Sequence, residues 1–434
     1  MANSFIANDS GSRVATYLHS DGKYRTFVET FGDKLLTLKT ENIGNPSYEY
    51  SDFVSRFIGG FRLPVDTYGA SNAGRSPGAI GYNPANDSIF LAGRFEHGAI
   101  GEFSIPALVN NDTDVSALNF AANIQPFVQK VTGDAAFIGQ GVNISGLHYD
   151  PSTDRLLMNV FRFYDQSATK LDTVHMLIDG ASDLATSAQT GYLTNQLGGR
   201  AGGWMMPIPA HLQADLGGTH LQGWSTSTGR ASPYTLQNGP GIAAGNPNAA
   251  LANYGGISVL DAIALADYLP RDTETIRNLF SDRYNSTGNN YTWTSYSECS
   301  TAFVFPGTRT VMVIGQSGGH LLYNPNNLNP PGLVYQTNDP ITGYKGYFPA
   351  EPYDRYAYYW LLSIDDLIDA RNGVIETKDV VEYETGIFPA PYGVTNISGG
   401  TYDVASRRLL LSCDYADSLQ GTPTQTIAVY QFPE

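Results

Sequence analysis

The stretch SGGTYDVASRRLLLSC at residues 398–413 contains the pattern on which the fold prediction depends. Gly399, Gly400 and Tyr402 lead into a polar turn, and an apolar run at 409–411 follows that turn. This arrangement is typical of two strands joined by a tight turn. The stretch therefore predicts a β-hairpin.

The same hairpin pattern recurs along the chain. A tyrosine precedes Asn or Asp, a polar turn and an apolar strand at Tyr82, Tyr149 and Tyr402. The other copies read GAIGYNPANDSIFLAG (78–93), SGLHYDPSTDRLLMNV (145–160) and, more loosely, STAFVFPGTRTVMVIG (300–315). A repeated unit that cannot bury its own faces indicates a repeat architecture. We therefore expect an all-β fold, and specifically a β-propeller.

The spacing of the copies sets the expected number of blades. The interval from Tyr82 to Tyr149 fits one long blade, and that from Val304 to Tyr402 fits two short ones. Two or three further blades fit between them. We expect seven blades, with six as the alternative. The last strand, at 426–432, is predicted to close the ring.

Composition narrows the function and the location. Asp and Glu number 41 against 25 Lys and Arg, and this net charge of −16 argues against nucleic-acid binding. No apolar run reaches membrane-spanning length, and the first residues do not match a secretory signal. The low charged fraction of 15% and the 28 tyrosines suit an exposed surface. The expected location is a virion or an extracellular surface.

The first fifty residues differ from the rest because they lack the hairpin pattern. Residues 14–31 alternate around Asp21 and Gly22, which predicts an antiparallel pair. We expect residues 1–50 to form an N-terminal β arm for attachment or oligomerisation, and residues 51–434 to form the propeller. Fewer than twenty residues of the arm resemble the β segments that begin phage structural proteins. The implied partners are other virion or assembly proteins, or further copies of this chain.

Small inserts interrupt the strands. Residues 246–284 have helical spacing in places, and residues 324–353 form a loop too long for a blade turn. The segment SIDDLIDARNG (363–373) predicts a short helix that is capped by Ser363 and ends at Asn372 and Gly373. The cysteines, Cys299 and Cys413, are expected to be free and buried because each adjoins an apolar strand.

From about residue 57 to the end, the chain resembles a group of bacterial β-propeller-like proteins, most of them secreted and uncharacterised. The resemblance implies the fold and no defined chemistry. Its matching pieces are GGFRLP (59–64), GYNPANDSIFLAGRFEHGAIGEFSIP (81–106), HLQADLGG (211–218), STGRASPYT (227–235), AYYWLLSIDDL (357–367) and PYGVTNISGGTYDVASRRLLLS (391–412).

The richest polar cluster lies at residues 211–234. Arg230 could neutralise a uronate carboxylate while His220 or Tyr234 exchanges the α-proton, as in a polysaccharide lyase. The alternative interpretation packs His220 between blades and pairs Arg230 with an acid. His148 is expected to have a structural role in its blade.

Aromatic rings supply candidate binding residues. Trp204, Trp224, Tyr356 and Tyr358 present flat apolar faces with polar edges, which suit sugars and protein interfaces. The alternative is that they fill the blade core, since aromatic residues favour strands.

No zinc pattern is found, and no cofactor is expected. Residues 110–114 carry alternating oxygens that could hold calcium, with a solvated turn as the alternative interpretation. Two functions remain. The first is a non-enzymatic binding or structural propeller on a particle, most simply a phage decoration, tail or host-attachment protein that contacts a partner or a cell-surface glycan. The second is a lyase acting on uronate-containing glycans.

Overall fold

The structure is a computed structural model, and it confirms the all-β propeller. No helix in the part of the chain that it describes is both long and apolar enough to cross a membrane. The described residues are 4–7, 12–18, 24–30, 36–39, 53, 55–95, 97–131, 142–162, 174–195, 197, 202–223, 239–252, 258–260, 263–266, 293–294, 297–318, 335–338, 345–349 and 355–433.

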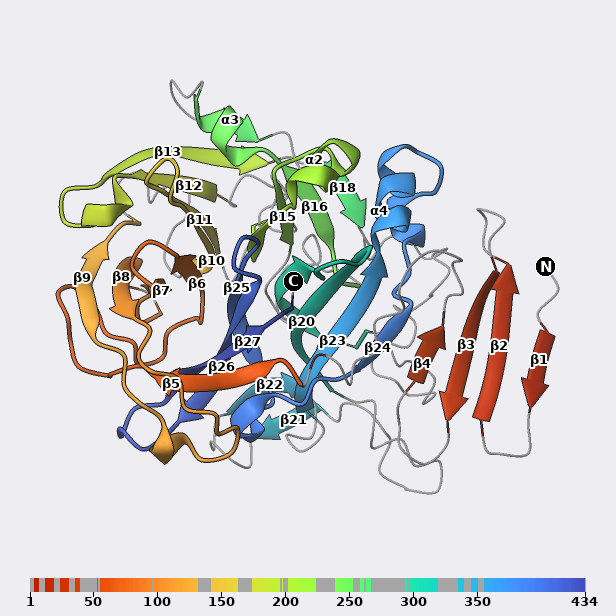
Figure 1. Cartoon of the computed structure of the whole chain (residues 1–434), viewed down its shortest axis with the longest axis horizontal. Helices are drawn as coiled ribbons and strands as arrows, with labels where there is room; N and C mark the ends of the chain where they lie inside the picture. The colour runs from red at the N-terminus through yellow and green to blue at the C-terminus, as the bar shows by residue number, and fades with distance from the viewer. Residues whose placement is uncertain are drawn as a thin grey trace.

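Five sheets of the described chain form the blades of the ring (Figure 1). Blade 1 contains β6 (Ile80–Asn83), β7 (Ser88–Ala92), β8 (Ala99–Ser104) and β9 (Asn123–Gln129). Blade 2 contains β10 (Val142–Asp150), β11 (Arg155–Arg162), β12 (Val174–Asp179) and β13 (Ala188–Asn195), with β17 (Ser258–Leu260) added in parallel to β13. Blade 3 contains β14 (Met205–Pro207), β15 (His220–Gly223), β16 (Ile242–Gly245) and β18 (Ile263–Ala266).

The last two blades complete the ring. Blade 4 contains β19 (Glu298–Val304), β20 (Thr310–Gly318), β23 (Arg355–Ser363) and β24 (Glu384–Ile387). Blade 5 joins β25 (Ile397–Asp403), β26 (Arg408–Asp417) and β27 (Thr424–Gln431) to β5 (Phe57–Arg62) from the other end of the propeller segment. The innermost strands β6, β10, β14, β19 and β25 each lie beside the innermost strand of the next blade, and β25 lies beside β6.

The prediction of seven or six blades is therefore wrong for the described chain, which has five. The interval from Val304 to Tyr402, which the spacing predicts to hold two short blades, holds only one. The insertion between β20 and β23 spans residues 319–354 and carries the separate pair β21 (Tyr335–Asn338) and β22 (Lys345–Pro349). Length alone could not distinguish an insertion from a blade.

The repeated tyrosine pattern has a local cause. The hydroxyl of Tyr82 donates to the carboxylate of Asp87 at 3.1 Å, and that of Tyr149 donates to Asp154 at 3.0 Å. Asp87 and Asp154 adopt left-handed φ values of 46° and 53° just before the second strand, and Arg407 has 55° in blade 5. Asp and Asn tolerate this conformation better than most residues. The pattern therefore fixes the tight turn that joins the two strands of each of these hairpins.

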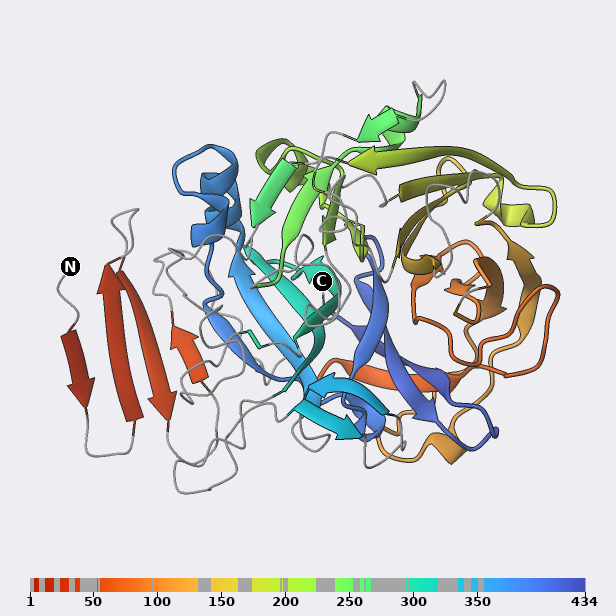
Figure 2. The same ribbon diagram turned by 180° about the vertical axis from the view of Figure 1, so that it is seen from behind.

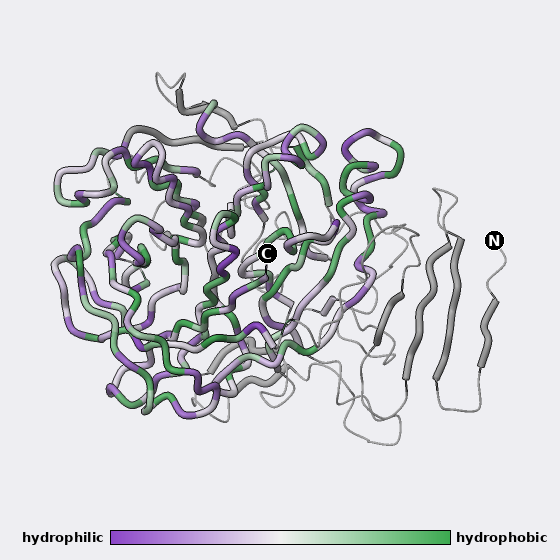
Figure 3. Tube along the Cα trace, in the orientation of Figure 1, coloured by the Kyte–Doolittle hydropathy of each residue, from purple (hydrophilic) through white to green (hydrophobic). Residues whose placement is uncertain are grey.

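The core lies between neighbouring blades. The ring of Tyr149 in blade 2 packs on Phe90 of blade 1, with ring centroids 5.1 Å apart. The ring of Tyr402 in blade 5 packs on Phe303 of blade 4 at 5.2 Å. Hydrophobic and hydrophilic stretches are accordingly interleaved around the ring rather than separated onto two halves (Figure 3). Each blade needs its neighbours to bury its faces.

Helices are few and short in the described chain. The helices are α2 (Ala210–Leu216), α3 (Pro247–Ala252) and α4 (Ile364–Arg371), with 3-10 turns at Val115–Ala117, Ala181–Asp183, Thr377–Asp379 and Pro391–Gly393. The predicted cap is confirmed, because Ser363 accepts a hydrogen bond from the Asp366 amide and Gly373 has φ of 72°. The helical prediction for 246–284 is only partly right, since α3 is followed by strands β17 and β18, and residues 267–284 lie outside the described chain.

The N-terminal strands form a sheet of their own. It consists of β1 (Ser4–Ala7), β2 (Ser12–Leu18), β3 (Tyr24–Thr30) and β4 (Leu36–Lys39), in that order. The antiparallel pair predicted around Asp21 and Gly22 is confirmed as β2 and β3. Strand β4 lies beside β24, so the sheet stands at the side of blade 4 in both views (Figures 1 and 2).

Blade 5 closes the ring by pairing the first strand of the propeller with the last. The predicted partner is confirmed, because β27 pairs with β5 in antiparallel register from Thr426 opposite Arg62 to Tyr430 opposite Phe57. Both cysteines, Cys299 and Cys413, are free and buried, also as predicted.

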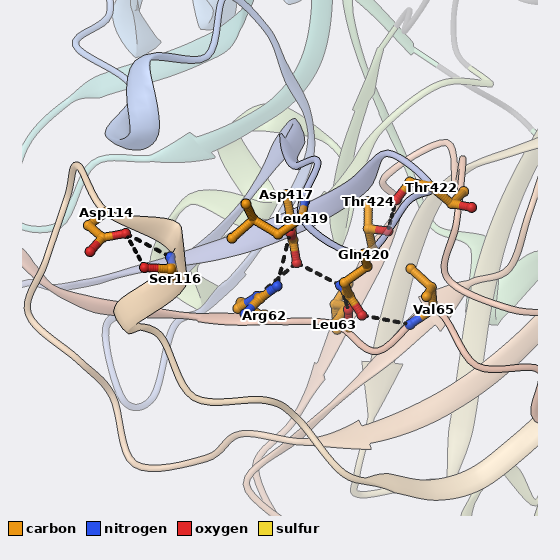
Figure 4. Close-up of polar contacts among 10 residues, drawn as sticks. All are labelled: Arg62, Leu63, Val65, Asp114, Ser116, Asp417, Leu419, Gln420, Thr422 and Thr424. Carbon is orange, nitrogen blue, oxygen red and sulfur yellow. Dashed lines mark hydrogen bonds and ion pairs between the residues drawn. The ribbon is translucent and has the colours of Figure 1, made fainter.

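A buried ion pair supports this closure (Figure 4). The Arg62 guanidinium donates to both carboxylate oxygens of Asp417 at 2.8 and 3.1 Å, and the Asp417 side chain has no exposed surface. The amide of Leu419 and the side chain of Gln420 donate to the same carboxylate at 3.0 and 2.6 Å. The guanidinium also lies 4.2 Å from the centroid of the Phe120 ring. The charges are therefore well compensated.

We expect Arg62→Ala to destabilise the propeller by about 3–5 kcal/mol, because it leaves the Asp417 charge buried without a partner. The matched control is Arg155→Ala, which breaks a half-exposed pair with Asp179 at 2.6 Å and should cost less than about 1 kcal/mol. Urea denaturation measures both. Similar losses in the two variants would contradict the role assigned to the buried pair.

Candidate functional site

The two faces of the ring differ. Because each blade is an antiparallel meander, the turns joining first to second strands lie on one side, which we call the turn face. These connections are 84–87, 151–154, 208–219, 305–309 and 404–407, and the links from third to fourth strands lie on the same side. The opposite side, which we call the loop face, carries the links from second to third strands and from one blade to the next. Every insertion between second and third strands begins and ends on the loop face.

His220 lies at the turn-face end of β15 and is 5% exposed. Its ring packs edge-on against that of His148 on β10, with centroids 4.8 Å apart. The pair joins blade 2 to blade 3. This placement matches the interpretation of His220 as a residue packed between blades.

The hydrogen bonds of Thr219 define the tautomer of His220. The Thr219 hydroxyl donates to Asn246 Oδ1 at 3.3 Å, so it accepts from His220 Nδ1–H at 2.9 Å. His220 Nε2 is buried and has no hydrogen-bond partner within the described chain. Burial lowers the pKa of His148 to about 4 despite the nearby carboxylates of Asp150 and Asp403. Burial, followed by the charge of His148, lowers the pKa of His220 well below its ordinary value.

We expect acid to weaken the contact between blades 2 and 3. A histidine whose pKa is depressed on folding contributes full stability above its ordinary pKa of about 6.5 and loses that contribution as the pH falls toward 4. Replacing His148 with Gln should reduce the slope of the free energy of unfolding against pH in this window by up to about 1.4 kcal/mol per pH unit.

Urea denaturation at pH steps between 4 and 7 measures these slopes. The control is the wild-type chain, measured at the same pH steps. Equal slopes for the wild-type chain and His148→Gln would contradict the prediction.

The other predicted site residues fall in two groups. Arg230, Tyr234 and Trp224 lie outside the described residues, and the strand ends that flank them, Gly223 and Ile242, are on the loop face. His220 is at the opposite end of β15 from this segment. Of the three proposed lyase residues, the structure therefore describes only His220.

The predicted binding rings that the structure describes belong to the core. Trp204 is 1% exposed, Tyr358 is 5% exposed and Tyr356 is 8% exposed. Tyr358 stacks edge-on with Trp360 at 5.2 Å inside blade 4. These rings match the blade-core interpretation, and their faces are not available to a glycan in this conformation.

The segment proposed for calcium uses its oxygens locally. Asn111 Oδ1 accepts from the amides of Thr113 and Asp114 at 3.0 and 2.8 Å. Asp114 Oδ1 accepts from the amide and hydroxyl of Ser116 (Figure 4). Among the described residues, no group of three or more His, Cys, Asp or Glu is arranged to hold a metal ion.

The loop face carries a site that sequence reasoning missed. Three segments from blades 5 and 1 meet there: 71–78, 93–98 and 414–423. The Arg75 amide donates to the Pro423 carbonyl at 3.1 Å, and the Phe95 amide donates to the Arg75 carbonyl at 3.1 Å. The Arg94 amide donates to the Asn72 carbonyl at 2.9 Å. Backbone hydrogen bonds therefore hold the three segments against one another.

Tyr415 projects from this site. Its side chain is 47% exposed, and its φ of 50° is rare for a bulky residue. The strain arises in a bulge of β26 between Cys413 and Asp417. Strained, exposed residues of this kind are enriched at binding sites. Burial of the hydroxyl, followed by the charge of Asp414, raises the pKa of Tyr415, and the charges of Arg75 and Arg94 oppose that rise.

The charges of the two arginines are not neutralised by an ion pair within the described chain. Arg75 is exposed and Arg94 is half-buried, and neither forms an ion pair in the described part of the chain. Ser71 Oγ accepts from the Arg94 amide and hydrogen-bonds to His97 Nδ1, each at 2.9 Å, which orders the 93–98 segment. Two free guanidiniums beside an aromatic ring can bind an anionic group. We call Arg75, Arg94 and Tyr415 the arginine–tyrosine site.

A sequence signal for the two arginines did exist. The segments AGRSPGAIG (73–81) and AGRFEHGAIG (92–101) share Ala-Gly-Arg followed by Gly-Ala-Ile-Gly. This duplication places each arginine at the same distance before a strand of blade 1. The meeting of the duplicated segments with Tyr415 depends on ring closure, and no sequence spacing indicates it.

No protein-family model matches the sequence, and no curated protein sequence matches it. Among solved structures the chain is similar to Phage phi92 endosialidase, with a TM-score of 0.32 and 9% sequence identity. The alignment covers 100% of this chain and 58% of that chain. At this TM-score the likeness supports no conclusion about function. Of the resemblance to bacterial propeller-like proteins, the propeller fold is confirmed and no family match supports the remainder.

Proposed function

We propose that this chain is a non-enzymatic binding protein, in which a propeller is displayed on a particle and binds a partner or glycan through its loop face. The proposed particle is a phage virion. The observation that carries the proposal is the arginine–tyrosine site, where an exposed tyrosine and two arginines without ion pairs in the described chain come from three segments joined by backbone hydrogen bonds on that face. The left-handed backbone at Tyr415 and the hydrogen bonds between the three segments hold these groups in place.

The N-terminal sheet supplies the proposed attachment. Strands β1 to β4 pair only with one another, and none of them joins the sheet of a blade. The ring closes through β5 and β27 without their help. A sheet that contributes no strand to the ring is free to serve assembly with other virion proteins or with further copies of this chain.

The lyase alternative finds less support. The proposed lyase residues are His220, Arg230 and Tyr234, and of these the structure describes only His220. His220 is buried at the turn face. The described groups therefore suit binding better than proton abstraction.

Deleting residues 1–50 tests the proposed arrangement. We expect residues 51–434 to remain a folded monomer, because the ring closes within them, and to lose assembly with copies or virion proteins. Light scattering after size exclusion and co-purification with the particle measure both properties, with the full chain as control. Unchanged assembly of the shortened chain would refute the attachment role.

Incubation with uronate-containing polysaccharides tests the enzymatic alternative. We expect no rise in absorbance at the band of unsaturated uronates. A rise that disappears in His220→Ala and Arg230→Ala would establish the lyase and overturn the non-enzymatic proposal.

A further inference from the structure

The chemistry of the arginine–tyrosine site limits the class of ligand that it can bind. Arg75 and Arg94 present planar forks whose parallel N–H groups match the oxygens of a carboxylate. Neither fork is used by an ion pair among the residues that the structure describes. The segments that carry them are joined to each other and to the segment of Tyr415, because the Phe95 amide donates to the Arg75 carbonyl and the Arg75 amide donates to the Pro423 carbonyl, each at 3.1 Å. The cations and the ring therefore act within one site.

The ring adds a second requirement. Tyr415 is 47% exposed, so part of its side chain is accessible to a ligand. A flat aromatic face suits the C–H surface of a pyranose. A ligand that uses the whole site carries both a carboxylate and an apolar ring face.

The overall charge sets a limit on the ligand. A net charge of −16 repels polyanions such as nucleic acids and fully ionised polyuronates. Two local cations can still hold a single anionic group at short range, because charges closer than a Debye length are little screened. An isolated carboxylate is favoured over a run of them.

Resting on the proposed binding function, we infer that the arginine–tyrosine site binds a saccharide that bears one carboxylate. Arg75 and Arg94 hold the carboxylate, and Tyr415 stacks on the sugar ring. Asp414 stays outside the ligand contact, since its carboxylate accepts from Asn396 and Gln425 at 3.2 and 3.5 Å.

Calorimetry with the full chain tests the inference. The probes are a disaccharide ending in one glucuronic acid, the corresponding neutral disaccharide, a sulfated disaccharide and a poly-glutamate peptide. We expect the uronic acid probe to bind at least tenfold more tightly than the neutral one. Arg75→Ala and Arg94→Ala should each weaken its binding about tenfold to a hundredfold, the range for a charged hydrogen bond.

Further variants separate charge from fork geometry. Arg94→Lys keeps the charge but loses the bidentate contact, so its affinity should fall between wild type and Arg94→Ala. Tyr415→Ala should weaken binding, whereas Tyr415→Phe should retain most of it. Arg155→Ala, a half-exposed arginine on blade 2, should change nothing. Thermal unfolding of each variant confirms that the propeller is intact.

Three results would overturn the inference. One is undiminished binding of the uronic acid probe in folded Arg75→Ala and Arg94→Ala. The second is equal or tighter binding of the sulfated disaccharide or the poly-glutamate peptide with the same dependence on arginine. The third is no binding of any acidic saccharide. If assembly still depends on residues 1–50, or a neutral glycan binds elsewhere, the proposed function survives these results; if not, both proposals fail.

Discussion

The contact between Arg62 and Asp417 is the constraint on which the rest of the structure depends. A five-bladed ring needs its ends to be joined, and β5 and β27 come from opposite ends of the propeller segment. Because Asp417 has no exposed surface, its charge must be met by the guanidinium and by the Gln420 side chain. Gln420 in turn donates to the Leu63 carbonyl at 2.9 Å. The contacts that close the ring therefore also hold the 417–423 loop in place.

The same contacts position the segments that form the arginine–tyrosine site. The 414–423 segment meets the Arg75 amide through the Pro423 carbonyl at 3.1 Å, and Arg75 meets the Phe95 amide. Gly74 is required where segments 71–78 and 414–423 meet, because a side chain there would collide with Thr422. Loss of closure would therefore separate Tyr415 from both arginines. The arrangement of these three side chains therefore depends on a contact outside the arginine–tyrosine site.

The other end of the ring is built for packing. Tyr82 and Tyr149 hydrogen-bond to the turns of their hairpins, and the rings of Tyr149 and Tyr402 pack between blades. His148 and His220 pack ring to ring in the same kind of position, with burial keeping them neutral. His220, a catalytic candidate in the sequence, is thus part of the interface between blades. Longer connections occur at both ends of the blades, since α2 and α4 lie in links on the turn face and the 319–354 insertion begins on the loop face.

By itself, the sequence determined the hairpins, the closing strand, the Ser363 cap, the free cysteines and the separate N-terminal strands, because each depends on neighbouring residues or on a short apolar pattern. It did not determine the blade number, since the 319–354 insertion has the length of a blade. It also did not determine the site. Arg75, Arg94 and Tyr415 are brought together only by the closing of the ring, which joins residues more than 300 positions apart. Burial, which moved His220, Trp204, Tyr356 and Tyr358 into the core, is likewise a property of blades packed against one another.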